Sequence, residues 1–299
     1  MKPVQSISAS SLAEAVICEA SRNAAPSSPY TTEYLAKLVE DSYGNEWEQA
    51  ELDTFRLLIE DCDRFVDVGA NAGQYTYAAS QVMKNGEIVS IEANPFLTPV
   101  LDALAAQIEK APGGLHRVTV ANAAIVGQAG PIQMFISAYS QGSSVVTKCG
   151  EGINVTVPGR LLDSFYSPSR KTLVKMDIEG AEYRAMTGAG RFLTSGDTVF
   201  FLELHAWGDA AIRKYPLDVC TLFRRSGFAV QHVGHRVRNH YVFRQAKPLR
   251  CWLTYLMVLP RMTFLALVYR YGKSTVPMFR FLRDRVLFRT RSGFAGNRP

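Results

Sequence analysis

Short β-rich runs alternate with longer stretches of helical spacing from Arg64 onward. Several runs are apolar on successive positions, which is typical of strands covered on both faces. These runs lie at residues 65–68, 88–91, 118–120, 173–176 and 199–202. Because the strand-like runs alternate with helical stretches, we predict an α/β domain with a doubly wound, mainly parallel sheet.

The helical period disappears between Ala124 and Phe165, where further strands are expected at 132–136, 144–146 and 155–157. After Gly227, residues 228–230 and 240–243 form a plausible closing pair of strands. The N-terminal part has apolar residues at helical spacing, first at Leu12, Val16 and Ala20 and then around 34–38 and 52–59. We therefore divide the chain into N-terminal linker and helices (1–60), a main domain (61–246) and a C-terminal tail (247–299).

The tail contains two strongly apolar and aromatic runs, 251–259 and 262–269, which Pro260 and Arg261 separate. An arginine at the centre of a membrane-spanning helix costs ~2.5–3.5 kcal/mol, and a central proline kinks the helix. The basic flanks and the residues Trp252 and Tyr255 fit a segment lying in a membrane interface better. A helical cap docked on the protein explains the same apolar runs, and both interpretations stay open.

Charge is distributed unevenly along the chain. The formal net charge is +6, but residues 236–299 carry 14 Lys and Arg against one acid, Asp284, which gives +13. Residues 1–235 carry 19 basic and 26 acidic residues, which gives −7. Such asymmetry indicates an anionic partner, and the apolar runs of the tail favour an anionic membrane surface over nucleic acid. At 47% hydrophobic and 20% charged residues, the composition excludes global disorder.

The five cysteines are scattered, and no pair has CxxC spacing, so neither a disulfide framework nor a zinc knuckle is indicated. The N-terminus lacks the apolar run of a secretory signal. We therefore expect a cytoplasmic protein, peripheral at the inner membrane face.

The sharpest motif is the stretch Phe65-Val66-Asp67-Val68-Gly69-Ala70-Asn71-Ala72-Gly73 at the end of the first strand. Ligands bind beyond the carboxyl ends of strands in open α/β sheets, so Gly69, Ala70, Asn71 and Gly73 lie where a cofactor would bind. A dinucleotide fingerprint has glycine where Asp67 stands. An acid there repels phosphate and suits an ammonium or sulfonium ligand, which favours S-adenosylmethionine over NAD.

Three further strand ends carry polar residues suited to a cofactor. Glu92 ends the second strand, where an acid accepts hydrogen bonds from ribose hydroxyls. Asn122 follows the third strand, in position for an adenine contact. Asp177 ends the fourth parallel strand, beside the first, so its carboxylate is expected to face the reactive end of the cofactor. Glu179 and Glu182 follow at a helix start, where the helix dipole alone accounts for acids.

These residues together resemble the FkbM-type methyltransferase family. The resemblance covers roughly residues 60–245 and runs through residues 65–76, Ile91-Glu92-Ala93-Asn94-Pro95, Gly142-Ser143-Ser144, residues 175–182 and Glu203-Leu204-His205. It implies a class I, Rossmann-like methyltransferase fold, S-adenosylmethionine as cofactor, and O-methylation of sugars or natural products. Ala93 departs from the family, which more often has proline there.

Methyl transfer to a hydroxyl also needs a base within hydrogen-bond reach. The candidates are Asp177 and His205. Because a histidine titrates near neutrality, we expect His205 to be the better proton acceptor if it lines the pocket. Asp177, Glu203 and His205 could alternatively hold a divalent cation, but nothing in the spacing demands one, and we assign no metal ligand. His232, His235 and His240 lie among arginines, so we expect them to be solvated surface residues.

We therefore expect an S-adenosylmethionine-dependent O-methyltransferase acting on a hydroxyl of a sugar, glycolipid or natural product. Two alternatives belong to other classes. The first is a nucleic-acid-modifying methyltransferase that uses the basic tail as an arm, but no RNA-binding module is evident. The second is a non-catalytic, membrane-associated adaptor, against which the intact cofactor loop argues.

Overall fold

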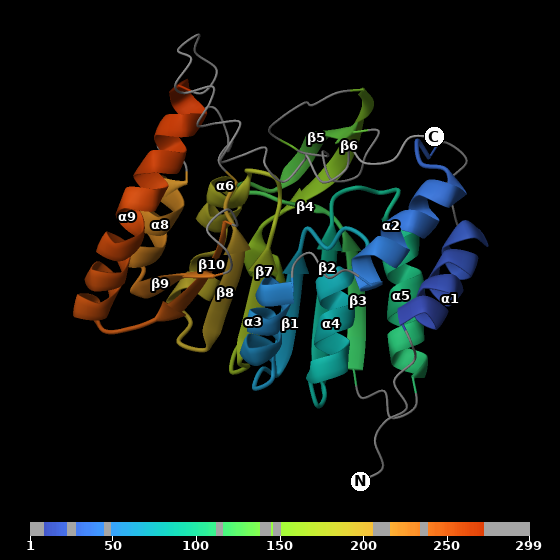
Figure 1. The fold of residues 1–299 in the computed structure, drawn as a ribbon, viewed down its shortest axis with the longest axis horizontal. Helices are drawn as coiled ribbons and strands as arrows, with labels where there is room; N and C mark the ends of the chain where they lie inside the picture. The colour runs from blue at the N-terminus through green and yellow to red at the C-terminus, as the bar shows by residue number, and fades with distance from the viewer. Residues whose placement is uncertain are drawn as a thin grey trace.

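A seven-stranded sheet forms the centre of the protein in a computed structural model, which describes residues 9–22, 28–44, 49–111, 116–137, 145, 151–205, 216–233 and 239–271 (Figure 1). The strand order is β3 (His116–Asn122), β2 (Gly86–Glu92), β1 (Arg64–Val68), β7 (Thr172–Met176), β8 (Thr198–Glu203), β10 (His240–Gln245) and β9 (Phe228–Val233). β10 is antiparallel to both of its neighbours, β8 and β9, and the other paired strands of this sheet are parallel. The predicted doubly wound, mainly parallel sheet is confirmed.

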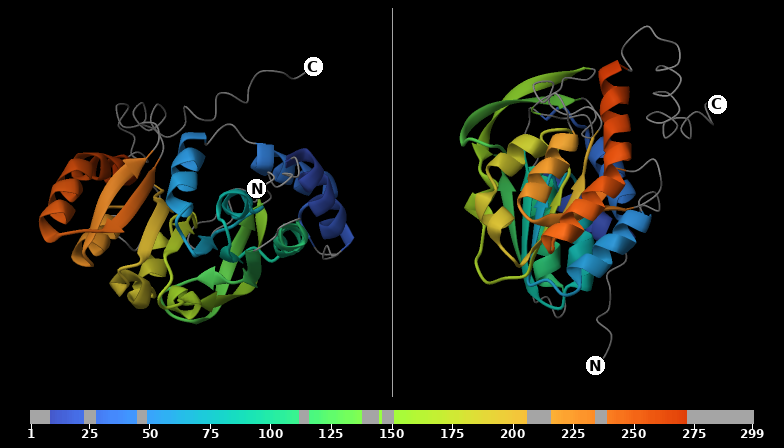
Figure 2. Two further views of the ribbon diagram at one scale, coloured as in Figure 1. Left: turned by 90° about the horizontal axis from the view of Figure 1, so that it is seen from below. Right: turned by 90° about the vertical axis from the view of Figure 1, so that its left-hand side faces the viewer.

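Helices cover both faces of this sheet because its central strands are apolar on both sides (Figure 2). On one face, Phe65 packs with α3 (Gln49–Ile59) and α4 (Gln74–Val82). On the other, Val66 packs with α6 (Glu182–Thr187), α7 (Gly190–Thr194) and α8 (Leu217–Arg225). The helix α5 (Thr98–Lys110) packs along β3.

A second, three-stranded sheet lies between β3 and β7 in the chain. Its order is β4 (Ala124–Ile125), β6 (Gly152–Arg160) and β5 (Gly130–Ser137), and a 3-10 turn, η2 (Leu162–Phe165), leads back to the main sheet. The strands predicted at 132–136 and 155–157 are confirmed as β5 and β6. Of the strand expected at 144–146, residues 144 and 146 lie outside the described residues.

The N-terminal helices α1 (Ala9–Arg22) and α2 (Thr32–Gly44) pack beside α5, with the predicted apolar positions Leu12, Val16 and Ala20 buried. The loop between them contributes Tyr30, whose hydroxyl donates to the backbone oxygen of Ser137 (3.2 Å) and accepts from Asn94 Nδ2 (2.9 Å). The N-terminal segment thereby holds the end of β5 and the loop that follows β2 in place.

The two apolar runs of the tail form one helix, α9 (Pro248–Tyr271), which passes through Pro260. It packs on β9 and α8, and Thr254 Oγ1 accepts a hydrogen bond from the Val230 N–H of the edge strand (3.1 Å). Arg261 turns inward and donates to Tyr241 Oη (3.0 Å). Among the described residues, no helix is long and apolar enough to cross a membrane. The remainder of the tail, 272–299, lies outside the described residues.

Candidate functional site

The loop after β1 makes a sharp turn that depends on its glycines. Gly69 has φ +76° and Gly73 has φ +88°, a region that disfavours residues with a Cβ. The N–H groups of Gly69 and Ala70 both donate to Ile91 O, at 2.9 and 3.1 Å. A Cβ at Gly69 would collide with the backbone oxygen of Asp177. The absent side chain therefore lets the ends of β1 and β7 touch, which brings Asp177 beside the loop.

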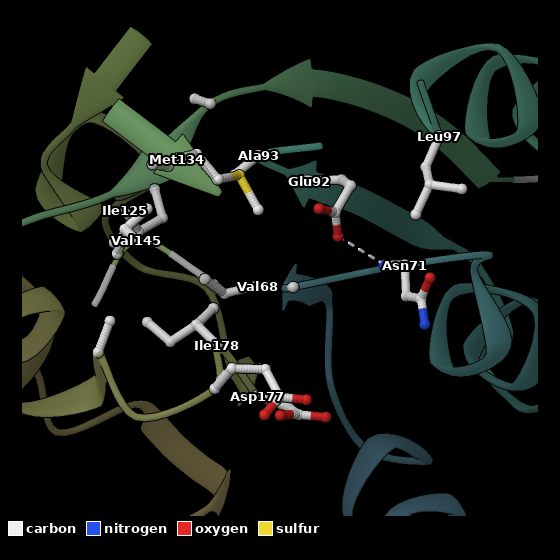
Figure 3. Close-up of a pocket in the computed structure, with 15 residues that line it drawn as sticks. Val68, Asn71, Glu92, Ala93, Leu97, Ile125, Met134, Val145, Asp177 and Ile178 are labelled. Atoms are coloured by element: carbon white, nitrogen blue, oxygen red, sulfur yellow. Dashed lines mark hydrogen bonds between the residues drawn. The ribbon is translucent and has the colours of Figure 1, made fainter. Parts of the chain in front are cut away.

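Glu92 at the end of β2 holds this loop from the neighbouring strand. Its carboxylate accepts the N–H of Asn71 at Oε2 (2.8 Å) (Figure 3). It also accepts the N–H of Asn94 at Oε1 (2.7 Å). Asn71 has φ +50°, an unusual conformation that the first of these bonds supports. Burial raises the pKa of Glu92, while the two N–H donors act in the opposite direction. Each oxygen keeps a lone pair for a ligand hydroxyl.

A cavity of about 660 Å³, counted to its open mouth, lies beyond the ends of β1, β2 and β7 (Figure 3). The large apolar side chains that line it are Ile125, Met134, Val145 and Ile178 on one side, and Leu97 on the other side, near Glu92 and Asn71 (Figure 3). The polar side chains at its rim are Asn71, Glu92, Asp177 and Glu179.

Four of the predicted cofactor residues, Gly69, Asn71, Glu92 and Asp177, line this cavity. Asn71 Oδ1 and Asp177 Oδ1 are buried and make no hydrogen bond with the described residues. A glycine that permits close backbone approach, a carboxylate with spare lone pairs, and two unsatisfied acceptors beside an apolar wall fit a nucleoside carrying a cationic side chain.

The other four predicted cofactor residues, Asp67, Ala70, Gly73 and Asn122, are not among the lining residues. Asp67 is fully buried behind the loop and accepts a hydrogen bond from Thr76 Oγ1 (2.9 Å). Asn122 donates its side-chain N–H groups to the backbone oxygens of Glu92 (2.9 Å) and Ala93 (3.2 Å). These residues shape the cavity wall from behind.

Lys175 is a site residue for which the sequence suggested no role. Although it stands in a strand buried on both faces, its Nζ donates to Gly69 O (3.0 Å) and lies 3.6 Å from Asp67 Oδ1. It ties the glycine loop to β7 and compensates the buried Asp67 carboxylate. The available signal was the lysine itself, because a charge inside an otherwise apolar strand needs a partner.

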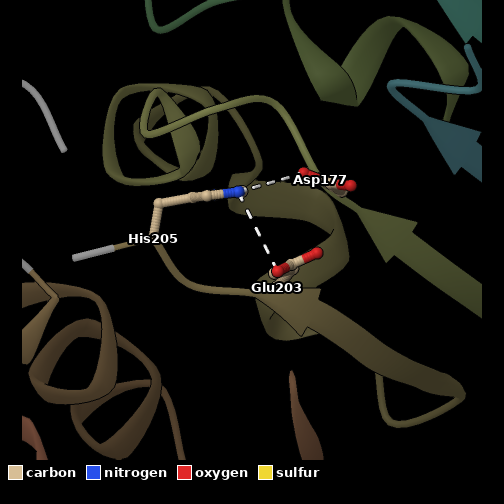
Figure 4. A group of neighbouring side chains, drawn as sticks. All are labelled: Asp177, Glu203 and His205. Atoms are coloured by element: carbon tan, nitrogen blue, oxygen red, sulfur yellow. Dashed lines mark ion pairs between the residues drawn. The ribbon is translucent and has the colours of Figure 1, made fainter. Parts of the chain in front are cut away.

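His205 lies beyond the end of β8, among four carboxylates that we call, together with it, the His205 cluster (Figure 4 shows two of the four). Its Nε2 is 3.7 Å from Asp177 Oδ1, 3.6 Å from Glu179 Oε2 and 3.9 Å from Glu203 Oε1. Its Nδ1 is 3.5 Å from Glu182 Oε1. The two predicted catalytic residues, Asp177 and His205, are thus neighbours, although only Asp177 lines the cavity.

The protonation of the His205 cluster follows from this crowding. Burial alone would lower the pKa of His205, but the Glu182 carboxylate and the charges of Glu203, Glu179 and Asp177 raise it well above 6.5. Burial would raise the pKa of Asp177, but Lys175 and His205 hold it below its ordinary value. At neutral pH, Asp177 is therefore ionised and His205 is protonated. An imidazolium has no lone pair to accept a proton, which makes Asp177 the better-placed acceptor.

Glu182 and Glu179 have more than the helix-start role that the sequence suggested. Glu182 is fully buried, accepts the N–H groups of Ile178 and Gly180 (3.2 Å each), and faces His205 Nδ1. Glu179 has φ +55° and lines the cavity. Burial, followed by the neighbouring acids, raises its pKa to about 8.

Three of these residues offer ligand atoms in the arrangement of a cation site. One atom each from Asp177, Glu203 and His205 lie within 4.8 Å of one another (Figure 4). This is the set whose spacing along the chain did not demand a metal. Carboxylate oxygens and an imidazole nitrogen suit a divalent ion. The same arrangement is equally suited to a protonated His205 surrounded by carboxylates.

The prediction that His240 is a solvated surface residue is wrong. It is 2% exposed, its Nε2 is 3.5 Å from Glu203 Oε2, and its ring stacks on Phe201. The reason is topological, because β10 inserts between β8 and β9 instead of lying at the sheet edge. His232 is half-buried, and His235 lies outside the described residues.

The sequence and the structure both have likenesses among known proteins. Residues 67–230 match the family described as the methyltransferase FkbM domain. No curated protein matches the chain.

Among solved structures, a methyltransferase FkbM from Methylobacillus flagellatus KT is 14% identical, with a TM-score of 0.46 over 76% of this chain and 57% of that protein. The chain thus spans little more than half of that protein's length. An O-methyltransferase from Bacillus cereus in complex with SAH is 14% identical (TM-score 0.37, 81% of this chain and 92% of that one). A magnesium protoporphyrin IX methyltransferase from Synechocystis PCC 6803 with bound SAM is 9% identical (0.39, 72% and 84%).

Proposed function

The chain belongs to the FkbM methyltransferase family, and on that premise we propose that it transfers the methyl group of S-adenosylmethionine to a hydroxyl of a sugar, glycolipid or natural product. The observation that carries this proposal is the buried Glu92 carboxylate, which faces the cavity beside the Gly69 turn. A carboxylate at this strand end is suited to a ribose diol and unsuited to a phosphate.

In this proposal the two halves of the cavity hold different parts of the cofactor. Asn71 and Glu92 bind the ribose, and the apolar side chains, among them Leu97 and Ile125, enclose the base. The cationic end of the ligand lies toward the ionised Asp177 carboxylate, because the negative charge of the cavity is concentrated around Asp177. When bound, S-adenosylmethionine supplies the methyl group on an activated sulfonium.

Asp177 also carries the proposed chemistry. Its carboxylate lines the cavity, is ionised at neutral pH, and is held by the Asp177 N–H bond to Val68 O (3.0 Å). It accepts a hydrogen bond from the acceptor hydroxyl and takes the proton as the oxygen attacks. His205 acts here as a positioning residue, because its protonated ring compensates the surrounding carboxylates and orients Asp177. A divalent cation held by Asp177, Glu203 and His205 would lower the pKa of the hydroxyl by a different route.

Replacing Glu92 with glutamine tests the proposal. The amide keeps the size of the side chain but removes the charge and leaves a donor facing either Asn71 N–H or Asn94 N–H. We expect S-adenosylmethionine affinity to fall about 10- to 100-fold, the loss typical of a charged hydrogen-bond pair. Isothermal titration calorimetry measures it.

Glu109→Gln is the matched control, because Glu109 also accepts a strand N–H, that of Val118 (3.0 Å), on the surface. It should bind the cofactor like the unmodified protein. Incubation with S-adenosylmethionine and glycan or lipid extracts, followed by mass spectrometry, tests transfer separately. Absence of cofactor binding by the unmodified protein would overturn the proposal.

A further inference from the structure

One face of α9 is apolar and open to solvent. The exposed stripe consists of Leu249, Trp252, Leu253, Leu256 and Met257, which are 49–80% exposed and recur at helical spacing. Among the described residues only two other large apolar side chains, Leu57 and Ile153, are exposed. Contiguous apolar surface of this kind marks an interaction site.

The opposite face of α9 is firmly attached to the protein. Cys251, Val258 and Met262 are buried, and Val258 and Met262 belong to the main core. Thr254 accepts the edge-strand N–H of Val230, and Arg261 donates to Tyr241. These contacts fix which face of the helix points outward, so the apolar runs of the tail serve two surfaces.

The stretch of sequence that contains the exposed stripe is basic. Residues 219–283 contain 12 Lys and Arg and no acid. Lys247, which directly precedes α9, and Arg250, on its first turn, are both exposed. The Arg224 guanidinium lies 3.9 Å from the centre of the Trp252 ring. An apolar stripe with a tryptophan and flanking cations is typical of a helix that lies in a membrane interface.

These charges also indicate which kind of partner binds the exposed stripe. A second copy of the chain would bring a like-charged surface to the same face, which is unfavourable. A nucleic acid would account for the arginines but not for three exposed Leu residues and Met257. A bilayer of anionic lipids matches both properties, because headgroups meet the cations and acyl chains receive the apolar side chains.

We propose that the exposed stripe of α9 docks the protein on an anionic membrane surface. The helix lies in the plane of the lipid headgroups, with its inner face still packed on β9 and α8. The proposal does not depend on methyl transfer, and its test needs none.

Co-sedimentation of the full chain with vesicles tests it, using phosphatidylcholine alone and phosphatidylcholine mixed in equal parts with phosphatidylglycerol. We expect binding to the anionic vesicles that weakens as salt is added. The variant Leu253→Gln/Leu256→Gln/Met257→Gln should bind the vesicles at least about tenfold more weakly, because three apolar side chains no longer enter the bilayer. Lys247→Glu/Arg250→Glu should lose the preference for the anionic vesicles.

Leu57→Gln is the control, because Leu57 is equally exposed (77%) but lies on α3. It should bind vesicles like the unmodified protein. Brominated lipids should quench part of the tryptophan fluorescence, and Trp252→Phe should remove that part. Equal vesicle binding by the triple variant and the unmodified protein would overturn the proposal. So would stripe-dependent dimerisation without vesicle binding, or binding to RNA but not to vesicles.

Discussion

Glu179 is a residue whose surroundings change the chemistry of its carboxyl group. Its carboxylate lies 3.6 Å from His205 Nε2, and Asp177, Glu182 and Glu203 are its acidic neighbours. Burial and these acids raise the pKa of Glu179 to about 8. The native protein therefore keeps a proton on Glu179 that the unfolded chain releases above its ordinary pKa of 4.5. Its φ of +55° adds strain at the same position.

The sign of the resulting pH dependence can be stated. A carboxyl with a raised native pKa makes the protein lose stability as pH rises from the unfolded to the folded pKa. His205 acts in the same direction, since its pKa is also raised and its contribution is lost as pH rises through that value. We expect the free energy of unfolding to fall between about pH 5 and about pH 8.5.

Glu179→Gln should remove much of this decline. The amide cannot ionise, so near pH 8.5 the variant should be more stable than the unmodified protein by about 1–2 kcal/mol, and near pH 5 about equal to it. Urea unfolding at both pH values measures the difference. Asp53→Asn, a change at an exposed position on α3, is the control and should leave the decline intact. Parallel pH curves for Glu179→Gln and the unmodified protein would contradict the protonation scheme given above.

At the scale of elements, the strands β1 and β7 are joined at their ends by the missing side chain of Gly69. Gly69→Ala would place a Cβ against the backbone oxygen of Asp177 and would also strain a φ of +76°. Backbone on both sides cannot move aside cheaply, so we expect a loss of about 3 kcal/mol or more in unfolding free energy. Cofactor affinity should fall as well, because the loop and Asp177 must separate.

Gly196→Ala provides the comparison for this change. Nothing lies within 4 Å of a Cβ at Gly196, so the substitution should alter stability by less than about 0.5 kcal/mol. Chemical denaturation of both variants is the measurement. Equal stability of Gly69→Ala and the unmodified protein would mean that the two strand ends do not touch as described.

Elements were the scale at which sequence reasoning succeeded best. The runs 65–68 and 173–176, apolar except for Asp67 and Lys175, predicted β1 and β7, because strands buried on both faces need no polar alternation. The same reasoning did not find that β10 lies between β8 and β9, and so it misplaced His240 on the surface. Strand order depends on contacts between segments far apart in the chain, which local periodicity does not report.

At the scale of the whole molecule, the cavity joins segments that are far apart in the sequence. Its walls come from the ends of β1, β2 and β7, from the inserted sheet, and from the start of the helix after Leu97. A ligand in the cavity contacts all of these segments, so it binds the native state and not the unfolded chain, and it therefore stabilises the native state. At 100 times its dissociation constant, it adds about 2.7 kcal/mol.

We therefore expect S-adenosylmethionine at that concentration to raise the melting temperature by about 5 °C or more. Differential scanning calorimetry measures the shift. Glu92→Gln should show a much smaller shift at the same concentration, whereas Glu109→Gln should show the full one. An equal shift of the melting temperature for both variants would mean that Glu92 does not bind the ribose as proposed.

The sequence by itself determined the elements, the position of the Gly69 loop, the polar residues at three further strand ends and the contrast between acidic body and basic tail. These are local properties, fixed by spacing and residue type. Only the tertiary structure decided which residues line the cavity, since it placed Asp67 behind the loop and Asp177 on the wall. It also surrounded His205 with carboxylates and gave α9 one packed face and one open face. Burial and charge proximity set these outcomes, and both arise only when distant segments pack together.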